Sequence, residues 1–147
     1  MLITKQIEID VAHRVLNHKS KCRSLHGHRY KIEVGVDDKV VTTKGVSDEG
    51  MVIDFSDLKQ IMMEELDEKF DHNAIFYKED PILVALKSYQ EEGNQFKQIW
   101  EADFIPTAEN LAKFWFELIE GRLLERGIKI KHLTVWETPT STATFTK

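Results

Sequence analysis

Cysteine, proline and glycine are scarce in this chain of 147 residues, which has one, three and seven of them. A single cysteine cannot close an internal disulfide, so a disulfide-stapled secreted fold is excluded and a cytoplasmic protein is expected. No apolar run approaches the roughly 20 residues that a membrane helix needs, so no membrane partner is expected. The alternating, acid-bearing N-terminus (MLITKQIEID) does not resemble a signal peptide.

The chain also has no excess of positively charged residues. Lysine and arginine number 20 against 25 aspartates and glutamates, a net charge of −5. This balance argues against a nucleic-acid partner, which usually meets a basic face. A small anionic molecule stays acceptable, because a pocket can be basic in an acidic protein. With 41% hydrophobic residues and no repeat or linker, we expect a single globular domain over residues 1–147.

Hydrophobic periodicity predicts both strands and helices. Residues in phase with a period of two predict strands at 3–15, 26–36 and 130–138. Residues 51–55 are expected to form a short return strand after the polar segment 37–50, and a short strand within 96–105 is ambiguous. Spacing of three and four residues, with caps, predicts helices from about 55 to 70, 80 to 93 and 107 to 127. The pattern is that of an α+β fold, an antiparallel sheet with helices packed on one face.

Three histidines lie on the apolar faces of the first two expected strands. His26 and His28 lie on one side of the second strand, about 6.5–7 Å apart along it. His13 lies on the apolar face of the first strand, so all three side chains can point to one spot. An HxH pair alone is common by chance, and the third histidine makes a zinc site the favoured interpretation. Three histidines without a fourth protein ligand are typical of a catalytic zinc. His18 and His132 have no other candidate ligands near them in the pattern, so we interpret them as solvated or structural residues.

The lone cysteine, Cys22, lies four residues before His26. A lone cysteine is most often a small buried hydrophobic residue. Here it stands in a polar loop between Lys21 and Arg23, and basic neighbours favour the thiolate form. The position therefore indicates a reactive thiol at the entrance of the predicted zinc site.

Five short motifs, in order along the chain, carry a family resemblance. They are Ala12-His13 with CxxxHGH at 22–28, GMVIDF at 50–55, Asp71-His72, PTAENLA at 106–112 and Trp136-Glu137-Thr138. Together they resemble the 6-carboxytetrahydropterin synthases and their 6-pyruvoyl-tetrahydropterin synthase relatives over about residues 7–140. Phe70 replaces the family's usual leucine. After Asn73-Ala74-Ile75-Phe76 the chain continues into an insertion, residues 77–104, that is longer than bacterial members usually have.

The resemblance implies roles for named residues. Zn²⁺ would bind His13, His26 and His28. Cys22 would transfer protons, with Asp71 and His72 as its activating partners. Glu137 would anchor the pterin, with Thr107 and Glu109 in or beside the same pocket.

Glu137 also has a physical rationale, because it shares the apolar phase of its strand, where a carboxylate needs a strong partner. The ring N–H and exocyclic amine of a pterin are two parallel donors that match its two oxygens. Without the resemblance, Glu137 would be interpreted as a solvated strand-end residue, and Asp71-His72 as an ordinary loop pair.

The resemblance also implies a reaction and an assembly. The substrate would be 7,8-dihydroneopterin triphosphate, whose side-chain oxygens zinc would polarise as a Lewis acid. The 6-carboxy branch releases acetaldehyde and triphosphate and supplies deazapurine or queuosine precursors; the 6-pyruvoyl branch releases triphosphate and isomerises the side chain. The short loop from His13 to Cys22 favours the 6-carboxy branch. The implied tunnelling fold completes its barrel by oligomerisation, commonly as a hexamer, with Glu137 serving a neighbour's zinc.

Two other classes of protein stay open at this point. One is a non-catalytic zinc- or pterin-binding protein on the same scaffold, which would not need Cys22 in its position. The other is a zinc hydrolase, for which the sequence offers no independent support. A structural zinc would require a fourth protein ligand, for which Cys22 is the candidate.

Overall fold

The computed structural model describes residues 1–94 and 99–147. Its strands are β1 (Leu2–His13), β2 (His26–Asp37), β3 (Asn73–Tyr77), β4 (Ile99–Ala102), β5 (Ile130–Thr138) and β6 (Ser141–Thr146). Its α-helices are α1 (Phe55–Met62), α2 (Glu68–Phe70), α3 (Ile82–Glu91) and α4 (Ala108–Leu124). A π-helical turn, η2 (Met63–Asp67), joins α1 to α2, and the short 3-10 helix η1 (Lys21–Arg23) lies between β1 and β2.

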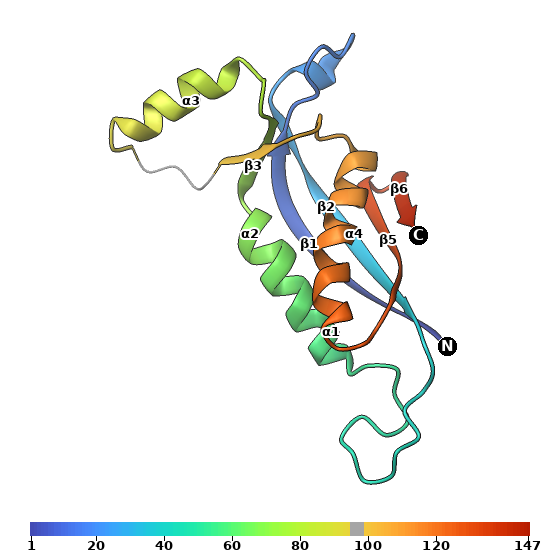
Figure 1. Ribbon diagram of the computed structural model, residues 1–147. Coiled ribbons are helices and arrows are strands. Elements are labelled where there is room, and N and C mark those ends of the chain that lie inside the picture. The colour runs from blue at the N-terminus through green and yellow to red at the C-terminus, as the bar shows by residue number, and fades with distance from the viewer. Residues whose placement is uncertain (95–98) are drawn as a thin grey trace.

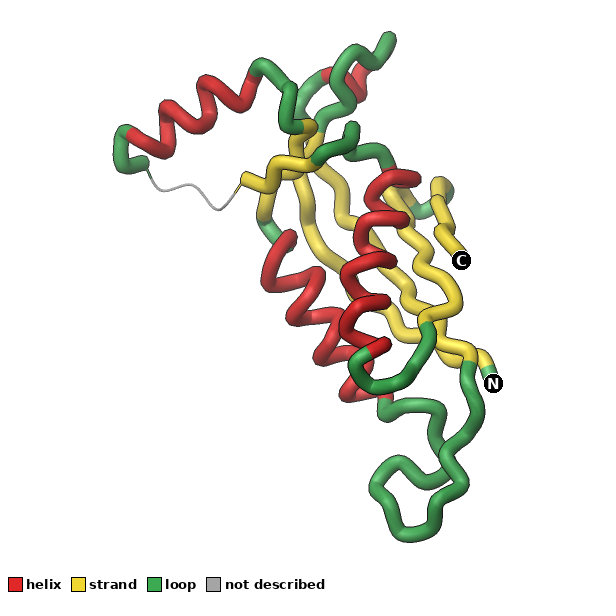
Figure 2. Tube along the Cα trace, viewed as in Figure 1, coloured by secondary structure: helices red, strands yellow, loops and turns green. Residues whose placement is uncertain are grey.

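The strands form one six-stranded sheet in the order β4-β3-β1-β2-β5-β6. Strands β1, β2 and β5 pair antiparallel as predicted, and β6, which was not predicted, adds antiparallel to β5. Strand β3 pairs parallel to both β1 and β4, so the expectation of a purely antiparallel sheet is corrected at this edge. The α+β class is confirmed. The helical segment from α1 to α2 and helix α4 cover the same face of the curved sheet (Figures 1 and 2).

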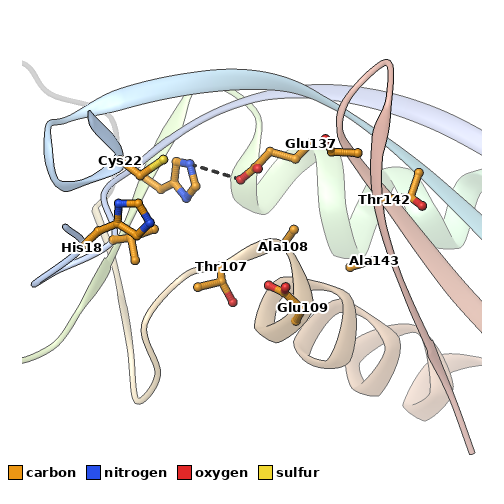
Figure 3. A pocket seen from close by; sticks show the side chains of 11 residues that line it. His18, Cys22, Thr107, Ala108, Glu109, Glu137, Thr142 and Ala143 are labelled. Atoms are coloured by element: carbon orange, nitrogen blue, oxygen red, sulfur yellow. Dashed lines mark ion pairs between the residues drawn. The ribbon is translucent and has the colours of Figure 1, made fainter. Parts of the chain in front are cut away.

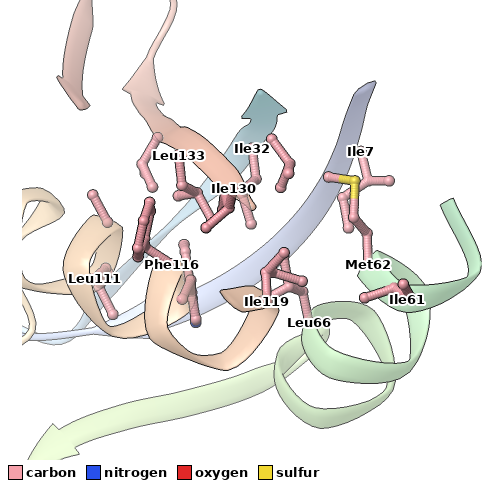
Figure 4. Packing of buried hydrophobic residues seen from close by; sticks show 14 of the residues in the cluster. Ile7, Ile32, Ile61, Met62, Leu66, Leu111, Phe116, Ile119, Ile130 and Leu133 are labelled. Atoms are coloured by element: carbon pink, nitrogen blue, oxygen red, sulfur yellow. The ribbon is translucent and has the colours of Figure 1, made fainter. Parts of the chain in front are cut away.

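The main core lies between this face and the helices. Ile7, Ile32 and Leu133 from the sheet meet Phe116 and Ile119 of α4, and the apolar side of α1 closes the same cluster (Figure 4). Along β1 and most of β2 these side chains alternate with exposed or half-buried residues, as the period of two predicts. In β5 the alternation is interrupted, because Thr134 between Leu133 and Val135 is buried as well. None of the helices in residues 1–94 and 99–147 combines the length and apolar character needed to cross a membrane.

The strand expected at residues 51–55 is wrong. This stretch is a bend that leads into α1, because Asp54 is the N-cap of that helix and its side chain accepts a hydrogen bond from the Ser56 N–H at 2.6 Å. Gly50, just before the bend, has φ of +86°, a left-handed conformation that glycine adopts without strain. The helix start predicted at Asp54 to Ser56 is therefore confirmed. The apolar residues Val52 and Ile53 pack into the core from the bend that precedes it.

The longer insertion is partly a sheet extension. Strand β3 begins at Asn73, before the insertion proper, and β4 pairs with it. Helix α3 stands away from the other helices (Figure 1), and its Leu83 packs in a small separate cluster with Ala74 and Phe76. The ambiguous strand expected within 96–105 is β4, and residues 96–98 of that range lie outside the described residues.

Candidate active site

The three histidines meet where the core ends. On the face that the helices cover, β1 and β2 carry apolar side chains along most of their length and histidines at one end. His13 lies directly opposite His26 in the antiparallel register, and His28 lies opposite Val11. The ring centroids are 4.6 Å apart for His13 and His26 and 5.2 Å apart for His13 and His28. The structure therefore brings together the three residues whose phase suggested a common site.

The ring nitrogens are arranged as in a metal-binding group. Nδ1 of His13 contacts the Pro106 carbonyl oxygen at 2.6 Å, and Nδ1 of His26 contacts the Ser24 carbonyl oxygen at 2.7 Å. A carbonyl only accepts, so each Nδ1 carries a proton, and in the neutral ring Nε2 then keeps a free lone pair. Backbone carbonyls orient metal-binding histidines in this way. Nε2 of His28 is buried without a hydrogen-bond partner among the described residues.

One ligand atom from each histidine lies within 4.8 Å of the others, so small side-chain rotations suffice for all three to reach one ion. Burial lowers the pKa of both His13 and His28 below the ordinary 6.5, which keeps them neutral at pH 7. Neutral imidazole is the form that binds metal. Cys22 is not part of this group in the described chain, so the structure offers the ion three protein ligands rather than four.

Glu137 lies beside the same histidines. Its Oε1 is 3.7 Å from Nε2 of His13 and 3.8 Å from Nε2 of His28 in the same chain. The Tyr30 hydroxyl donates to that oxygen at 3.4 Å and lies 3.3 Å from Nε2 of His13. Tyr30 is fully buried, and burial raises its pKa, so the hydroxyl keeps its proton. Within one chain, the carboxylate thus already faces the three histidines of the candidate metal site, without a contribution from a neighbour.

A cavity of about 240 Å³ opens beside this cluster. Figure 3 shows half-buried Cys22 and His18 on one side, Glu137 on the opposite side, and Thr107 and Glu109 at the start of α4. Thr107 is the N-cap of α4, and its hydroxyl accepts from the Asn110 N–H at 3.4 Å. His13 also lines this cavity. It therefore brings a thiol, a carboxylate and one histidine of the candidate metal site to a single space.

Asp71 and His72 lie in a different place. His72 lines a second cavity together with Asp10, His28 and Arg29, and Cys22 does not line that cavity. Nδ1 of His72 contacts Asp71 Oδ2 at 2.6 Å, and Asp71 Oδ1 accepts from the Asp10 N–H at 2.8 Å. His72 has φ of +57°, a left-handed conformation uncommon outside glycine, and its N–H donates to the Asp10 carbonyl at 2.7 Å. One chain thus forms the Asp-His pair but does not place it in the cavity of Cys22.

Comparison with known proteins identifies the family. The family model described as 6-pyruvoyl tetrahydropterin synthase matches residues 2–147. The chain belongs to this family. Among its curated relatives, a 6-carboxy-5,6,7,8-tetrahydropterin synthase of Rickettsia felis is 33% identical over 92% of this chain and 93% of its own length. The corresponding synthase of Aquifex aeolicus is 37% identical over 86% of this chain and 76% of its own length.

Solved structures of the 6-pyruvoyl tetrahydropterin synthase family share the fold. The 6-pyruvoyl tetrahydropterin synthase of Caenorhabditis elegans superimposes with a TM-score of 0.69 at 23% identity, covering 100% of this chain and 95% of its own. An uncharacterized protein from Wolinella succinogenes gives a TM-score of 0.81 at 24% identity, with 100% and 98% coverage. At such low identity these neighbours support the tunnelling fold alone.

Two residues that line or contact this site were not identified from the sequence. Tyr30 follows the apolar phase of β2 and was counted only as a strand residue, although its hydroxyl joins His13 and Glu137. His18 was interpreted as solvated or structural, and the structure places it on the wall of the cavity. His132 does have a structural role, because its Nε2 lies 3.3 Å from Glu33 Oε1 on the opposite face of the sheet.

Proposed function

We propose that this protein is a zinc-dependent 6-carboxytetrahydropterin synthase that converts 7,8-dihydroneopterin triphosphate and water to 6-carboxytetrahydropterin, acetaldehyde and triphosphate. The observation that carries the proposal is the single cavity bounded by His13, Cys22 and Glu137. The relatives that match most of the chain at 31–37% identity bear the name of this enzyme, which favours the 6-carboxy over the 6-pyruvoyl reaction.

In this proposal, zinc would be held by His13, His26 and His28 and would polarise the side-chain oxygens of the substrate as a Lewis acid. The paired donors of the pterin ring would bind the two oxygens of Glu137, a charge-assisted arrangement that fixes the ring. The Tyr30 hydroxyl donates to one of those oxygens and so holds the carboxylate in place. Thr107 and Glu109 would contact the substrate from the start of α4.

The proposed proton carrier is the Cys22 sulfur, since it is the thiol on the cavity wall and is only half-buried. Asp71 and His72 are proposed as its partners. Because one chain keeps the pair in another cavity, we propose that they act on Cys22 of a neighbouring subunit. Strands β4 and β6 form the two edges of the curved sheet, and edge pairing into a hexameric barrel would bring subunits together. We propose the cytoplasm as the location, consistent with the lone cysteine.

Replacing Cys22 with alanine separates an enzyme from a non-catalytic zinc protein. A catalyst keeps its zinc and loses turnover, because the histidines hold the metal without the thiol. A structural zinc site with Cys22 as fourth ligand loses both metal and stability. Zinc content by mass spectrometry, together with product analysis, distinguishes the two. A 6-pyruvoyl product from the unaltered protein would assign it to the other branch.

A further inference from the structure

The loop between β1 and β2 gathers positive charge in an acidic protein. Residues 11–32 contain six lysines and arginines and no acidic residue, whereas the whole chain has a net charge of −5. Four of these cations, Arg14, Lys19, Lys21 and Arg23, fall within the loop of residues 14–24. Such a local concentration raises the affinity of that surface for anions, whatever the overall charge.

The loop forms a groove that adjoins the active-site cavity. The groove has a volume of about 680 Å³ and shares one wall, His18, with the cavity that contains Cys22. Lys21 does not line it. The residues that do are Arg14, Leu16, Asn17, His18, Lys19, Arg23 and Ser24. An anion in this groove would therefore sit at the mouth of the active site, next to any molecule that fills the cavity.

Two of the three cations that line the groove, Lys19 and Arg23, are available for a ligand. Each of the other four arginines, at positions 14, 29, 122 and 126, contacts a carboxylate within 2.8 Å. Arg23 has no carboxylate within ion-pair distance among residues 1–94 and 99–147, and the same holds for Lys19. A free guanidinium presents a planar pair of N–H donors that match two phosphate oxygens.

The groove is also held in shape before any ligand binds. The Val15 N–H donates to the Cys22 carbonyl at 2.9 Å, and the Arg23 N–H donates to the Ser20 carbonyl at 3.2 Å. The Ser20 N–H donates to Nδ1 of His18 at 3.0 Å, which leaves Nε2 of the neutral ring as a donor. Arg14 anchors the base of the loop through its contact with buried Asp80. Binding there requires little ordering of the chain.

We propose that this groove holds the phosphate chain of the substrate and that Arg23 and Lys19 bind the phosphates. His18 would lie where the phosphate chain meets the part of the substrate that reacts in the cavity of Cys22. The inference rests on the proposed function, in which the pterin end faces Glu137 and the phosphates extend away from it. A chain of phosphates can contact several cations at once, which suits charges spread along a loop better than a single phosphate does.

The test uses inorganic triphosphate as the probe, with the zinc-loaded protein and calorimetry to measure its Kd. Arg23→Gln weakens triphosphate binding by about 10-fold or more, the scale of one charge-assisted hydrogen bond. Lys19→Gln weakens it by a smaller factor, about 3- to 10-fold. Lys21→Gln is the matched control, since it removes the same charge from the same loop outside the groove, and it changes Kd by less than about 2-fold.

A second ligand separates this proposal from the proposed function. Binding of 7,8-dihydroneopterin, which has the ring without phosphates, stays unchanged in Arg23→Gln, and KM for the triphosphate substrate rises with little change in kcat. Equal triphosphate affinity in all three variants, with zinc content retained, would place the anion on the metal and overturn the proposal. Triphosphate binding that does not compete with the substrate would overturn it too. Absence of turnover with the normal pattern of triphosphate affinities would count against the reaction and not against the groove.

Discussion

Replacing Asp80 with alanine removes the acidic partner of Arg14 from a site closed to solvent. The Asp80 side chain is 0% exposed, its Oδ2 lies 2.8 Å from Nε of Arg14, and its Oδ1 accepts from the Ile82 N–H at 3.1 Å. The residue therefore ties the start of α3 to the basic loop that follows β1. Its loss leaves the half-buried Arg14 guanidinium without its counter-charge and an unsatisfied N–H at the first turn of α3.

The size of the effect follows from these contacts. Deleting one partner of a buried ion pair costs about 3–5 kcal/mol. Arg14 keeps 23% of its side chain exposed, so water recovers part of this, and about 2–3 kcal/mol is the appropriate range. The lost hydrogen bond at the helix start adds about 1 kcal/mol. At about 2–4 °C per kcal/mol for a chain of this size, we expect the melting temperature to fall by about 10 °C.

Thermal unfolding followed by circular dichroism, at a fixed protein concentration, measures this change. Asp80→Asn keeps an oxygen for the Ile82 N–H and should lose only the charge-dependent part. Asp103→Ala is the control, because Asp103 belongs to the same insertion and pairs with Lys78 at 2.6 Å in an exposed position. It should leave the melting temperature unchanged. A melting temperature for Asp80→Ala equal to that of Asp103→Ala would refute the reasoning.

Three further predictions concern the site and the sheet. Glu137→Gln should lower kcat/KM by about 10- to 100-fold, since it removes the charged acceptor proposed for the pterin donors. Gly35→Ala should destabilise the fold by about 1–3 kcal/mol in urea unfolding, because its Cβ would lie 2.0 Å from the His132 ring. Burial lowers the pKa of His13 and His28 below 6.5, so the unfolded metal-free chain binds more protons than the folded one, and stability should fall as the pH drops below about 6.5.

Controls for these predictions are available in α4. Glu117→Gln changes an exposed carboxylate away from the cavity and should leave kcat/KM unchanged. A comparable loss there would mean that Glu137 has no special role. Gly121→Ala meets no atom within 4 Å and should be slightly stabilising, by about 0.5–1 kcal/mol, since alanine favours a helix. Metal-free protein whose stability rises between pH 7.5 and pH 5.5 would contradict the account of the buried histidines.

Much of the site was accessible from the sequence because its residues follow simple phases. His13, His26 and His28 continue the buried side of β1 and β2, so alternation alone puts them on one face. The contact of Tyr30 with Glu137 joins residues 107 positions apart, and no local spacing reports it. Within one chain Cys22 and His72 line different cavities, because β3, which follows His72 directly, pairs with β1. Local sequence patterns do not reveal this pairing.

The errors in the fold have identifiable physical causes. Strand β3 shows no alternation, since Asn73, Ala74, Ile75 and Phe76 are all buried, as is usual where parallel strands are covered on both faces. Residues 51–55 are apolar enough to suggest a strand, but the Asp54 cap starts α1 there. Strand β6 was not predicted, although Ala143 and Phe145 alternate with threonines and pack against the core.

The measurement that tests the central claim most directly is product analysis before and after zinc is returned to metal-stripped protein. The protein is incubated with 7,8-dihydroneopterin triphosphate, and the products are identified by mass spectrometry. We predict no product without metal, and 6-carboxytetrahydropterin with acetaldehyde once one zinc per chain is bound. Protein that holds this zinc on its histidines and still leaves the substrate unchanged would contradict the assignment.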